Sequence, residues 1–101
     1  MNFNPISVII PTYNRVNTIA YCLDSVMNQT LMPQEIIVVD DCSLDDTLLV
    51  VKHYNHPLVK IIQLQKNSGA QKARNAGIKS ATGEWIAFLD SDDQWMPEYL
   101  E

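Results

Sequence analysis

The chain has 101 residues, of which 47% are hydrophobic and 19% are charged, as in an ordinary globular domain. Such a length supports one domain with one modest core. The net charge of −5 argues against a nucleic-acid binder, which needs a basic face. No apolar run approaches the roughly 20 residues of a membrane-spanning helix. The first residues lack a secretory signal, so we expect a cytoplasmic location, free or peripheral at the membrane.

Four short runs rich in β-branched residues predict strands, at 6–10, 35–39, 59–64 and 85–89. The first, second and fourth runs are almost continuously apolar. Such runs are typical of parallel strands that are covered on both faces. We therefore expect helices on both faces of the sheet.

The segments between these strands predict three helices. At 19–27, apolar residues recur at the spacing of one helical face. Ser43 is expected to cap a second helix that runs to residue 54 or 55. A third helix, at 69–81, has small side chains on one face that suit close packing, and Gly83 is placed to end it.

The resulting order is β-α-β-α-β-α-β, with crossovers long enough to join parallel strands. This order predicts an α/β fold with an open, mostly parallel sheet, which is half of a doubly wound, Rossmann-like fold. No linker or repeat divides residues 1–101, so we assign them to one unit. The two cysteines, Cys22 and Cys42, show no metal-ligand spacing and are expected to be buried structural thiols.

Ligands of open parallel sheets bind beyond the carboxyl ends of the strands. Polar segments follow all four predicted strands, at 11–14, 40–43, 66–69 and 90–93. The opposite strand ends carry only residues of ordinary turns. One rim of the sheet is therefore predicted to hold the ligand.

Two carboxylates, Asp90 and Asp92, follow the fourth strand at a spacing of two residues. Their hard oxygens suit Mn²⁺ or Mg²⁺, whose remaining coordination sites favour phosphate oxygens. The alternative is a solvated acidic loop. A third acid at position 93 and a second acidic cluster at 40–46 favour the metal site.

Four further residues of this rim are candidate ligand contacts. Asp40 and Asp41 end the second strand, where such sheets place an acid that binds a ribose or a base. Tyr13 could stack on a base and Arg74 could pair with a diphosphate. Alternatively, an aspartate caps the second helix, Tyr13 packs over the first helix, and Arg74 faces solvent.

Four motifs taken together resemble the family 2 glycosyltransferases of the GT-A fold. They are SVIIPTYNR at 7–15, EIIVVDDCS at 35–43, NSGxxxARNxGI at 67–78 and FLDSDD at 88–93. The resemblance implies a sheet order of 3-2-1-4 and a nucleotide-diphosphate sugar donor, commonly a UDP-sugar. It also implies a divalent metal and a carbohydrate or lipid-linked acceptor.

The same resemblance implies which residues contact the donor. They are Pro11, Thr12, Tyr13, Asn14, Asp40, Asp41, Arg74, Asp90, Ser91 and Asp92. Asp92 matches the principal metal ligand, with Asp90 beside it. Cys42 stands where a glycine is common in the family.

This sequence departs from the family pattern in one respect, which concerns the general base that deprotonates the acceptor hydroxyl. Members of this family place it later in the sequence, beyond residue 101, so no catalytic residue is assigned in this chain. We therefore expect a truncated, N-terminal donor-binding portion of an inverting enzyme, inactive in transfer by itself. An apolar sheet edge left exposed would also promote self-association.

Two other classes of protein compete with this interpretation. A receiver domain also has paired aspartates after a strand, together with a motif like that at 93–97. In receivers, however, the pair follows the first strand and not the second. A non-catalytic nucleotide-binding module is the other alternative.

Overall fold

The computed structural model describes residues 3–100 as four strands and three helices. The strands are β1 (Phe3–Thr12), β2 (Met32–Asp40), β3 (Val59–Gln63) and β4 (Trp85–Phe88). The helices are α1 (Ile19–Met27), α2 (Thr47–Tyr54) and α3 (Ala70–Ser80). All strand pairs are parallel and the sheet order is β3-β2-β1-β4. The predicted fold class and strand order are confirmed.

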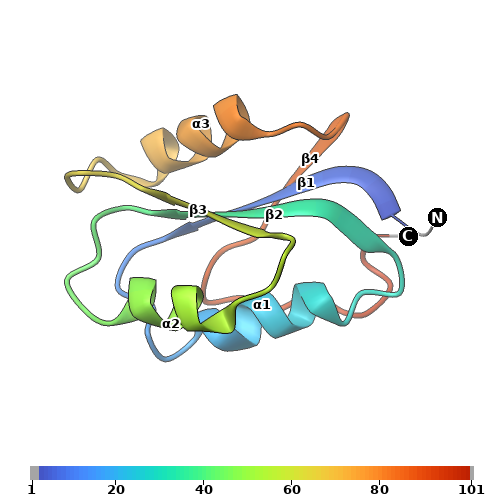
Figure 1. Cartoon of the computed structure of the whole chain (residues 1–101), viewed down its shortest axis with the longest axis horizontal. Coiled ribbons are helices and arrows are strands. Elements are labelled where there is room, and N and C mark those ends of the chain that lie inside the picture. Colours follow the sequence, from blue (N-terminus) through green and yellow to red (C-terminus); the bar gives the residue numbers. More distant parts are fainter. Residues whose placement is uncertain (1–2, 101) are drawn as a thin grey trace.

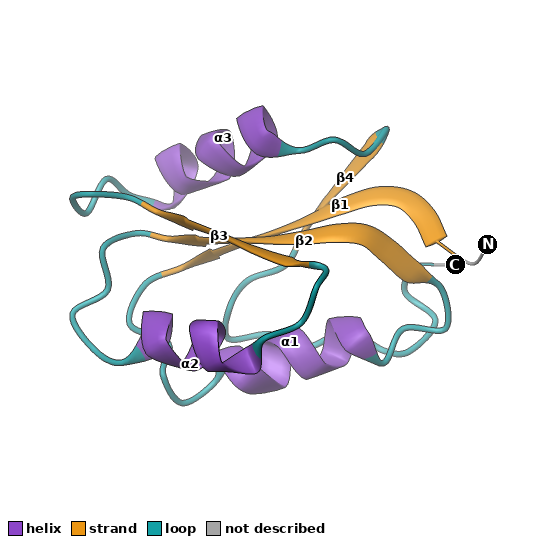
Figure 2. Ribbon diagram, viewed as in Figure 1, coloured by secondary structure: helices purple, strands orange, loops and turns teal. Residues whose placement is uncertain are grey.

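The sheet forms the middle layer of three. Helices α1 and α2 lie on one face and α3 lies on the other (Figure 1). Figure 2 shows the same layers by element type, with the loops gathered at the ends of the strands. Among residues 3–100, no helix is both long and apolar enough to cross a membrane.

Alternate residues of the central strands fill two separate cores. In β1, Val8 and Ile10 pack in the core that includes residues of α1 and α2, whereas Ile9 packs in the core that includes Ala73 of α3. The side chains of all four residues are fully buried. Strands β1 and β2 read as continuous apolar runs because each of their faces meets a helix.

Helix α3 approaches the sheet closely because its packed face carries small residues. A Cβ atom added to Gly77 would lie 2.6 Å from Cγ2 of Ile9, closer than carbon atoms can approach. Ala73, one turn earlier, is fully buried. The predicted small-residue packing face is confirmed.

The predicted roles of Ser43 and Gly83 at the helix ends are wrong. Helix α2 begins at Thr47 after Asp46, because the hydroxyl of Ser43 is hydrogen-bonded to Asp40 and does not cap a helix. Helix α3 ends at Ser80, and Gly83 lies beyond its cap. The glycine instead permits close contact with β1, since a Cβ atom there would lie 2.8 Å from the backbone nitrogen of Ser7.

Strand β4 is not covered on both faces as its apolar sequence predicts. It lies at the edge of the sheet, and Trp85, Ile86 and Phe88 are 66%, 38% and 44% exposed. A short apolar run cannot distinguish an edge strand from a central one, because both have the same local pattern.

A buried carboxylate joins the strands at the end of the sheet opposite the polar rim. Glu35 of β2 accepts hydrogen bonds from the hydroxyl of Ser7 (2.6 Å), Nζ of Lys60 (2.6 Å) and the backbone nitrogen of Thr82 (2.6 Å). Burial opposes ionisation, but these hydrogen bonds lower the pKa of Glu35 to about 2. This one side chain therefore links β1, β2, β3 and the turn before β4.

We predict that Glu35→Gln lowers the free energy of unfolding at pH 7 by about 2 kcal/mol, because donors of the native carboxylate lose their acceptor. The folded pKa lies below the ordinary 4.5, so the stabilisation is present above pH 4.5 and is lost as the pH falls toward 2. Denaturant unfolding at a series of pH values measures this loss. The exposed Glu84→Gln is the control, and equal effects of both substitutions would contradict the assignment.

We predict that the chain self-associates through β4, because an apolar edge strand pairs readily with another. Sedimentation velocity should show a monomer fraction that falls with concentration. Ile86→Lys should restore the monomer, whereas Gln71→Lys on the exposed surface of α3 should not. A monomeric wild-type chain at high concentration would refute this prediction.

Candidate functional site

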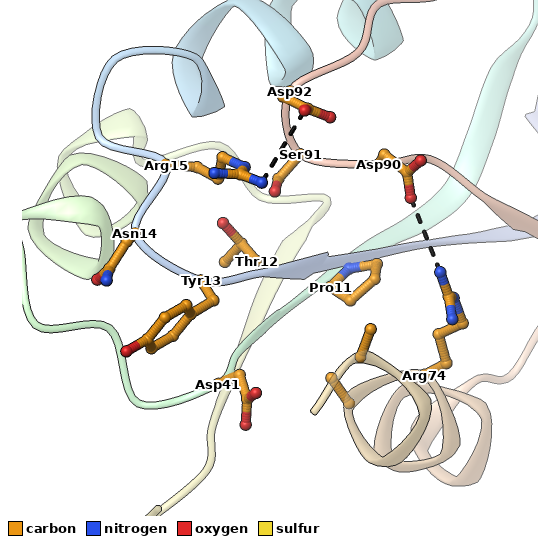
Figure 3. A pocket seen from close by; sticks show the side chains of 12 residues that line it. Pro11, Thr12, Tyr13, Asn14, Arg15, Asp41, Arg74, Asp90, Ser91 and Asp92 are labelled. Carbon is orange, nitrogen blue, oxygen red and sulfur yellow. Dashed lines mark ion pairs between the residues drawn. The ribbon is translucent and has the colours of Figure 1, made fainter. Parts of the chain in front are cut away.

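A cavity of about 500 Å³ lies at the carboxyl ends of β1, β2 and β4, beside the start of α3 (Figure 3). Its lining residues come from the end of β1, from the loops after these strands and from the first turns of α3. They are Pro11, Thr12, Tyr13, Asn14, Arg15, Asp41, Ala70, Ala73, Arg74, Asp90, Ser91 and Asp92. The cavity therefore gathers nine of the ten predicted donor contacts, all except Asp40.

The neighbouring Asp40 and Asp41 have different surroundings. The carboxylate of Asp40 accepts hydrogen bonds from the hydroxyl (2.5 Å) and the backbone nitrogen (3.1 Å) of Ser43. That of Asp41 faces the cavity and accepts bonds from the backbone nitrogens of Ser68 (2.8 Å) and Gly69 (2.9 Å), just before α3. Asp40 thus holds its own turn, and Asp41 is the aspartate of this pair that a ligand can reach.

The loop after β1 is tied to the loop after β2. Asn14 has a left-handed backbone (φ 54°), and its backbone nitrogen donates to the hydroxyl of Ser43 at 2.9 Å. Its side-chain oxygen accepts a bond from the backbone nitrogen of Leu44 at 2.8 Å. The next residue, Arg15, donates its backbone N–H to the hydroxyl of Thr47 at 2.8 Å. Asn14 therefore lines the cavity while its side chain supports the loops.

The acidic loop, residues 90–93, faces two arginines across the cavity (Figure 3). Asp90 lies 3.8 Å from a guanidinium nitrogen of Arg74, and Asp92 lies 3.9 Å from one of Arg15. The aspartate side chains are 68% and 56% exposed, so these ion pairs are weak in solvent. Each carboxylate remains available to a ligand.

Thr12 places a buried hydroxyl in the wall of the cavity. The residue is 3% exposed, and its Oγ1 has no hydrogen-bond partner among the described residues. Buried polar atoms are nearly always hydrogen-bonded in folded proteins. An unpaired hydroxyl in a cavity wall is therefore a candidate contact for a polar ligand.

The residues of this site fit the chemistry of Mg²⁺ or Mn²⁺. These ions are commonly held by one or two carboxylates and completed by substrate phosphates and water. Asp90 and Asp92 supply carboxylates, and they point toward different arginines (Figure 3). Among the residues that the structure describes, no three His, Cys, Asp or Glu side chains form a closed metal cage. Such an ion would therefore depend on phosphate ligands.

Arg15 lines the site, although the polar segment predicted after the first strand ends at Asn14. The left-handed turn at Asn14 redirects the chain and leaves Arg15 on the cavity wall. An asparagine in a turn is a weak signal of such a redirection, because asparagine tolerates this conformation better than most residues.

Cys42 differs from its prediction, whereas Cys22 agrees with it. Cys22 is fully buried. Cys42 is only partly buried, and it occupies a turn with a left-handed backbone (φ 63°). Glycine adopts this conformation without strain, which gives a physical reason for the glycine that is common at this place in the family.

Comparisons with known proteins agree with this geometry. The family model described as glycosyl transferase family 2 matches residues 7–101. The Staphylococcus aureus TarS structure in complex with UDP has a TM-score of 0.86 and 45% identity over 94% of this chain. The Pyrobaculum calidifontis mannosyltransferase PcManGT, in complex with GDP-Man and Mn²⁺, has a TM-score of 0.83 and 32% identity over 91%. The Escherichia coli UDP-Glc:alpha-D-GlcNAc-diphosphoundecaprenol beta-1,3-glucosyltransferase WfgD is 41% identical over 95% of the chain.

The parallel sheet with a polar pocket at its carboxyl rim defines a GT-A fold, and the chain belongs to glycosyl transferase family 2. The receiver-domain alternative is therefore wrong. The chain spans 29% of the crystallised TarS segment 1–349, 30% of the mannosyltransferase chain and 38% of WfgD, less than half of each.

We predict that Cys42→Gly raises the free energy of unfolding by about 1 kcal/mol, because it relieves the left-handed strain at this position. Asn14→Gly is the matched variant at the other left-handed turn of the site. It should instead destabilise the chain by about 1 kcal/mol, because the bond to Leu44 is lost. Urea unfolding measures both values, and a destabilising Cys42→Gly would contradict the argument.

Proposed function

We propose that this chain is the donor-binding part, residues 1–101, of an enzyme that transfers a sugar from a nucleotide-diphosphate sugar to an acceptor hydroxyl. The preferred donor is a UDP-sugar, and the acceptor is a carbohydrate or a lipid-linked saccharide. A lipid-linked acceptor would bring the enzyme to the membrane surface. The observation that carries this proposal is the cavity that joins Tyr13 and Asp41 to the arginines and the acidic loop.

The nucleoside end of the donor is assigned to the wall formed by Tyr13 and Asp41. Each carboxylate oxygen of Asp41 already accepts one backbone hydrogen bond, and each retains a lone pair for an N–H group of a base. The same two bonds fix the direction of the carboxylate. The ring of Tyr13 offers an aromatic face for stacking, and the free hydroxyl of Thr12 is available to the ribose or the base.

The diphosphate end is assigned to the acidic loop and the two arginines. A diphosphate brought beside Asp90 and Asp92 would meet strong repulsion, which Arg15 and Arg74 only partly offset. A bound Mn²⁺ or Mg²⁺ would supply the missing positive charge and stabilise the leaving nucleotide. Asp92 is proposed as its main protein ligand, with Asp90 beside it, and Ser91 completes the wall.

Transfer also needs a group that deprotonates the acceptor. In an inverting reaction the acceptor oxygen attacks the anomeric carbon from the face opposite the leaving nucleotide, so the base that takes its proton must lie on that face. The residues proposed above all serve the donor. We infer that the base comes from a part of the enzyme beyond residue 101, so the chain binds the donor without transferring sugar. The limited share of its relatives that the chain spans supports this inference.

We predict that UDP binds the chain more tightly with Mn²⁺ than without it, as measured by calorimetric titration. Asp92→Asn should remove the metal-dependent gain, a loss of at least about tenfold in affinity. Asp41→Asn should weaken UDP binding with and without metal, because its carboxylate contacts the base. Asp46→Asn, on an exposed aspartate outside the cavity, is the control.

Thermal unfolding of each variant separates a loss of ligand contacts from a loss of folding. If UDP binds the folded chain in neither condition, the proposed donor site is wrong for this chain. If Asp92→Asn and Asp46→Asn behave alike, the assignment of the metal ligand is wrong.

A further inference from the structure

The acidic loop needs support that the sheet does not provide. Strand β4 ends at Phe88, and the last backbone bond from this region to β1 joins the nitrogen of Leu89 to the oxygen of Ile9 at 3.1 Å. The loop then carries three aspartates within four residues, whose like charges repel one another. Its Ser91 is nonetheless only 5% exposed. Some other element must therefore hold the loop backbone.

Thr18 supplies one such contact from the start of α1. Thr18 occupies the N-cap position of the helix, where a threonine side chain ordinarily accepts a hydrogen bond from its own helix. No such bond is present here. The hydroxyl instead donates to the backbone oxygen of Ser91 at 3.0 Å, across 73 residues of sequence.

Cys22 supplies a second contact, one helical turn later. Its thiol is fully buried and donates to the backbone oxygen of Asp90 at 3.6 Å. The same oxygen accepts a bond from the backbone nitrogen of Asp93 at 2.9 Å. The thiol of Cys22 and the backbone nitrogen of Asp93 therefore both hold the backbone oxygen of Asp90.

We propose that Thr18 and Cys22 are positioning residues that orient the acidic loop for the metal-bound diphosphate. This inference rests on the donor site proposed above. The two side chains hold the consecutive carbonyl groups of Asp90 and Ser91, which sets the directions in which the carboxylates of Asp90 and Asp92 leave the backbone. Neither Thr18 nor Cys22 lines the cavity, so their action on the ligand is indirect.

The test compares Thr18→Val, which keeps the shape of the side chain but removes its donor, with Thr18→Ser, which keeps the hydroxyl. Cys22→Ala removes the second donor. Ser25→Ala is the control, because Ser25 is a buried residue of the same helix whose hydroxyl donates to the backbone oxygen of Cys22 at 2.7 Å. Calorimetry with uridine alone, and with UDP plus Mn²⁺, distinguishes the two ends of the donor.

We expect Thr18→Val and Cys22→Ala to weaken binding of UDP plus Mn²⁺ about tenfold, an effect typical of groups that orient metal ligands. Uridine binding should stay unchanged, because uridine lacks the diphosphate that the loop meets. Thr18→Ser should bind as the wild type does, and Ser25→Ala should alter neither affinity. Equal losses for uridine and UDP, or no loss for either ligand, would overturn the proposal.

Hydrogen exchange of the ligand-free chain measures the support of the acidic loop independently of ligand binding. The backbone N–H of Asp93 closes the turn of the acidic loop, so it should exchange several-fold faster in Thr18→Val than in Ser25→Ala. Unchanged exchange in Thr18→Val would overturn the positioning role. If the wild-type chain binds neither uridine nor UDP while exchange changes as expected, the donor site has failed but the support of the loop by α1 stands.

Discussion

Parallel pairing of β1 with both of its neighbours is the constraint on which the rest of this structure depends. Thr12 of β1 lies opposite Asp40 of β2, and Ile9 of β1 lies opposite Phe88 of β4. Because these strands run in the same direction, the loops that follow them emerge at one edge of the sheet. That shared edge brings Tyr13, Asp41 and the acidic loop around one cavity, although they are far apart in the sequence.

The cavity combines charges that would be unfavourable if they stood alone. Each carboxylate of the Asp90–Asp92 pair faces one arginine at 3.8 to 3.9 Å, at the long end of the range for ion pairs. Such contacts between exposed groups contribute little to stability. They leave both signs of charge free to rearrange around a phosphorylated ligand. The weak ion pairs thus suit a binding site better than a structural one.

Hydrogen bonds support the structure at two places, beside the cavity and at the opposite end of the sheet. At the opposite end of the sheet, Glu35 joins three strands and the turn that leads into β4. Beside the cavity, Asp41 secures the start of α3. Thr18, at the N-cap of α1, and Cys22, within α1, hold the backbone of the acidic loop. The carboxylates of Asp90 and Asp92 are exposed, while the backbone of their loop is hydrogen-bonded to Thr18 and to the buried Cys22. The charged side chains of the acidic loop are therefore carried by a backbone that is held by hydrogen bonds.

The sequence by itself determined the order of the elements, the parallel sheet and the edge that bears the site. These features follow from local apolar patterns and from the motifs at the strand ends. Tertiary structure decided which of two adjacent aspartates faces the cavity, because Asp40 is turned toward Ser43 whereas Asp41 lines the cavity beside the start of α3. It also decided that Arg15 joins the site and that the side chains of β4 stay partly exposed. These outcomes depend on a backbone turn and on contacts between distant segments, which no local pattern of residues encodes.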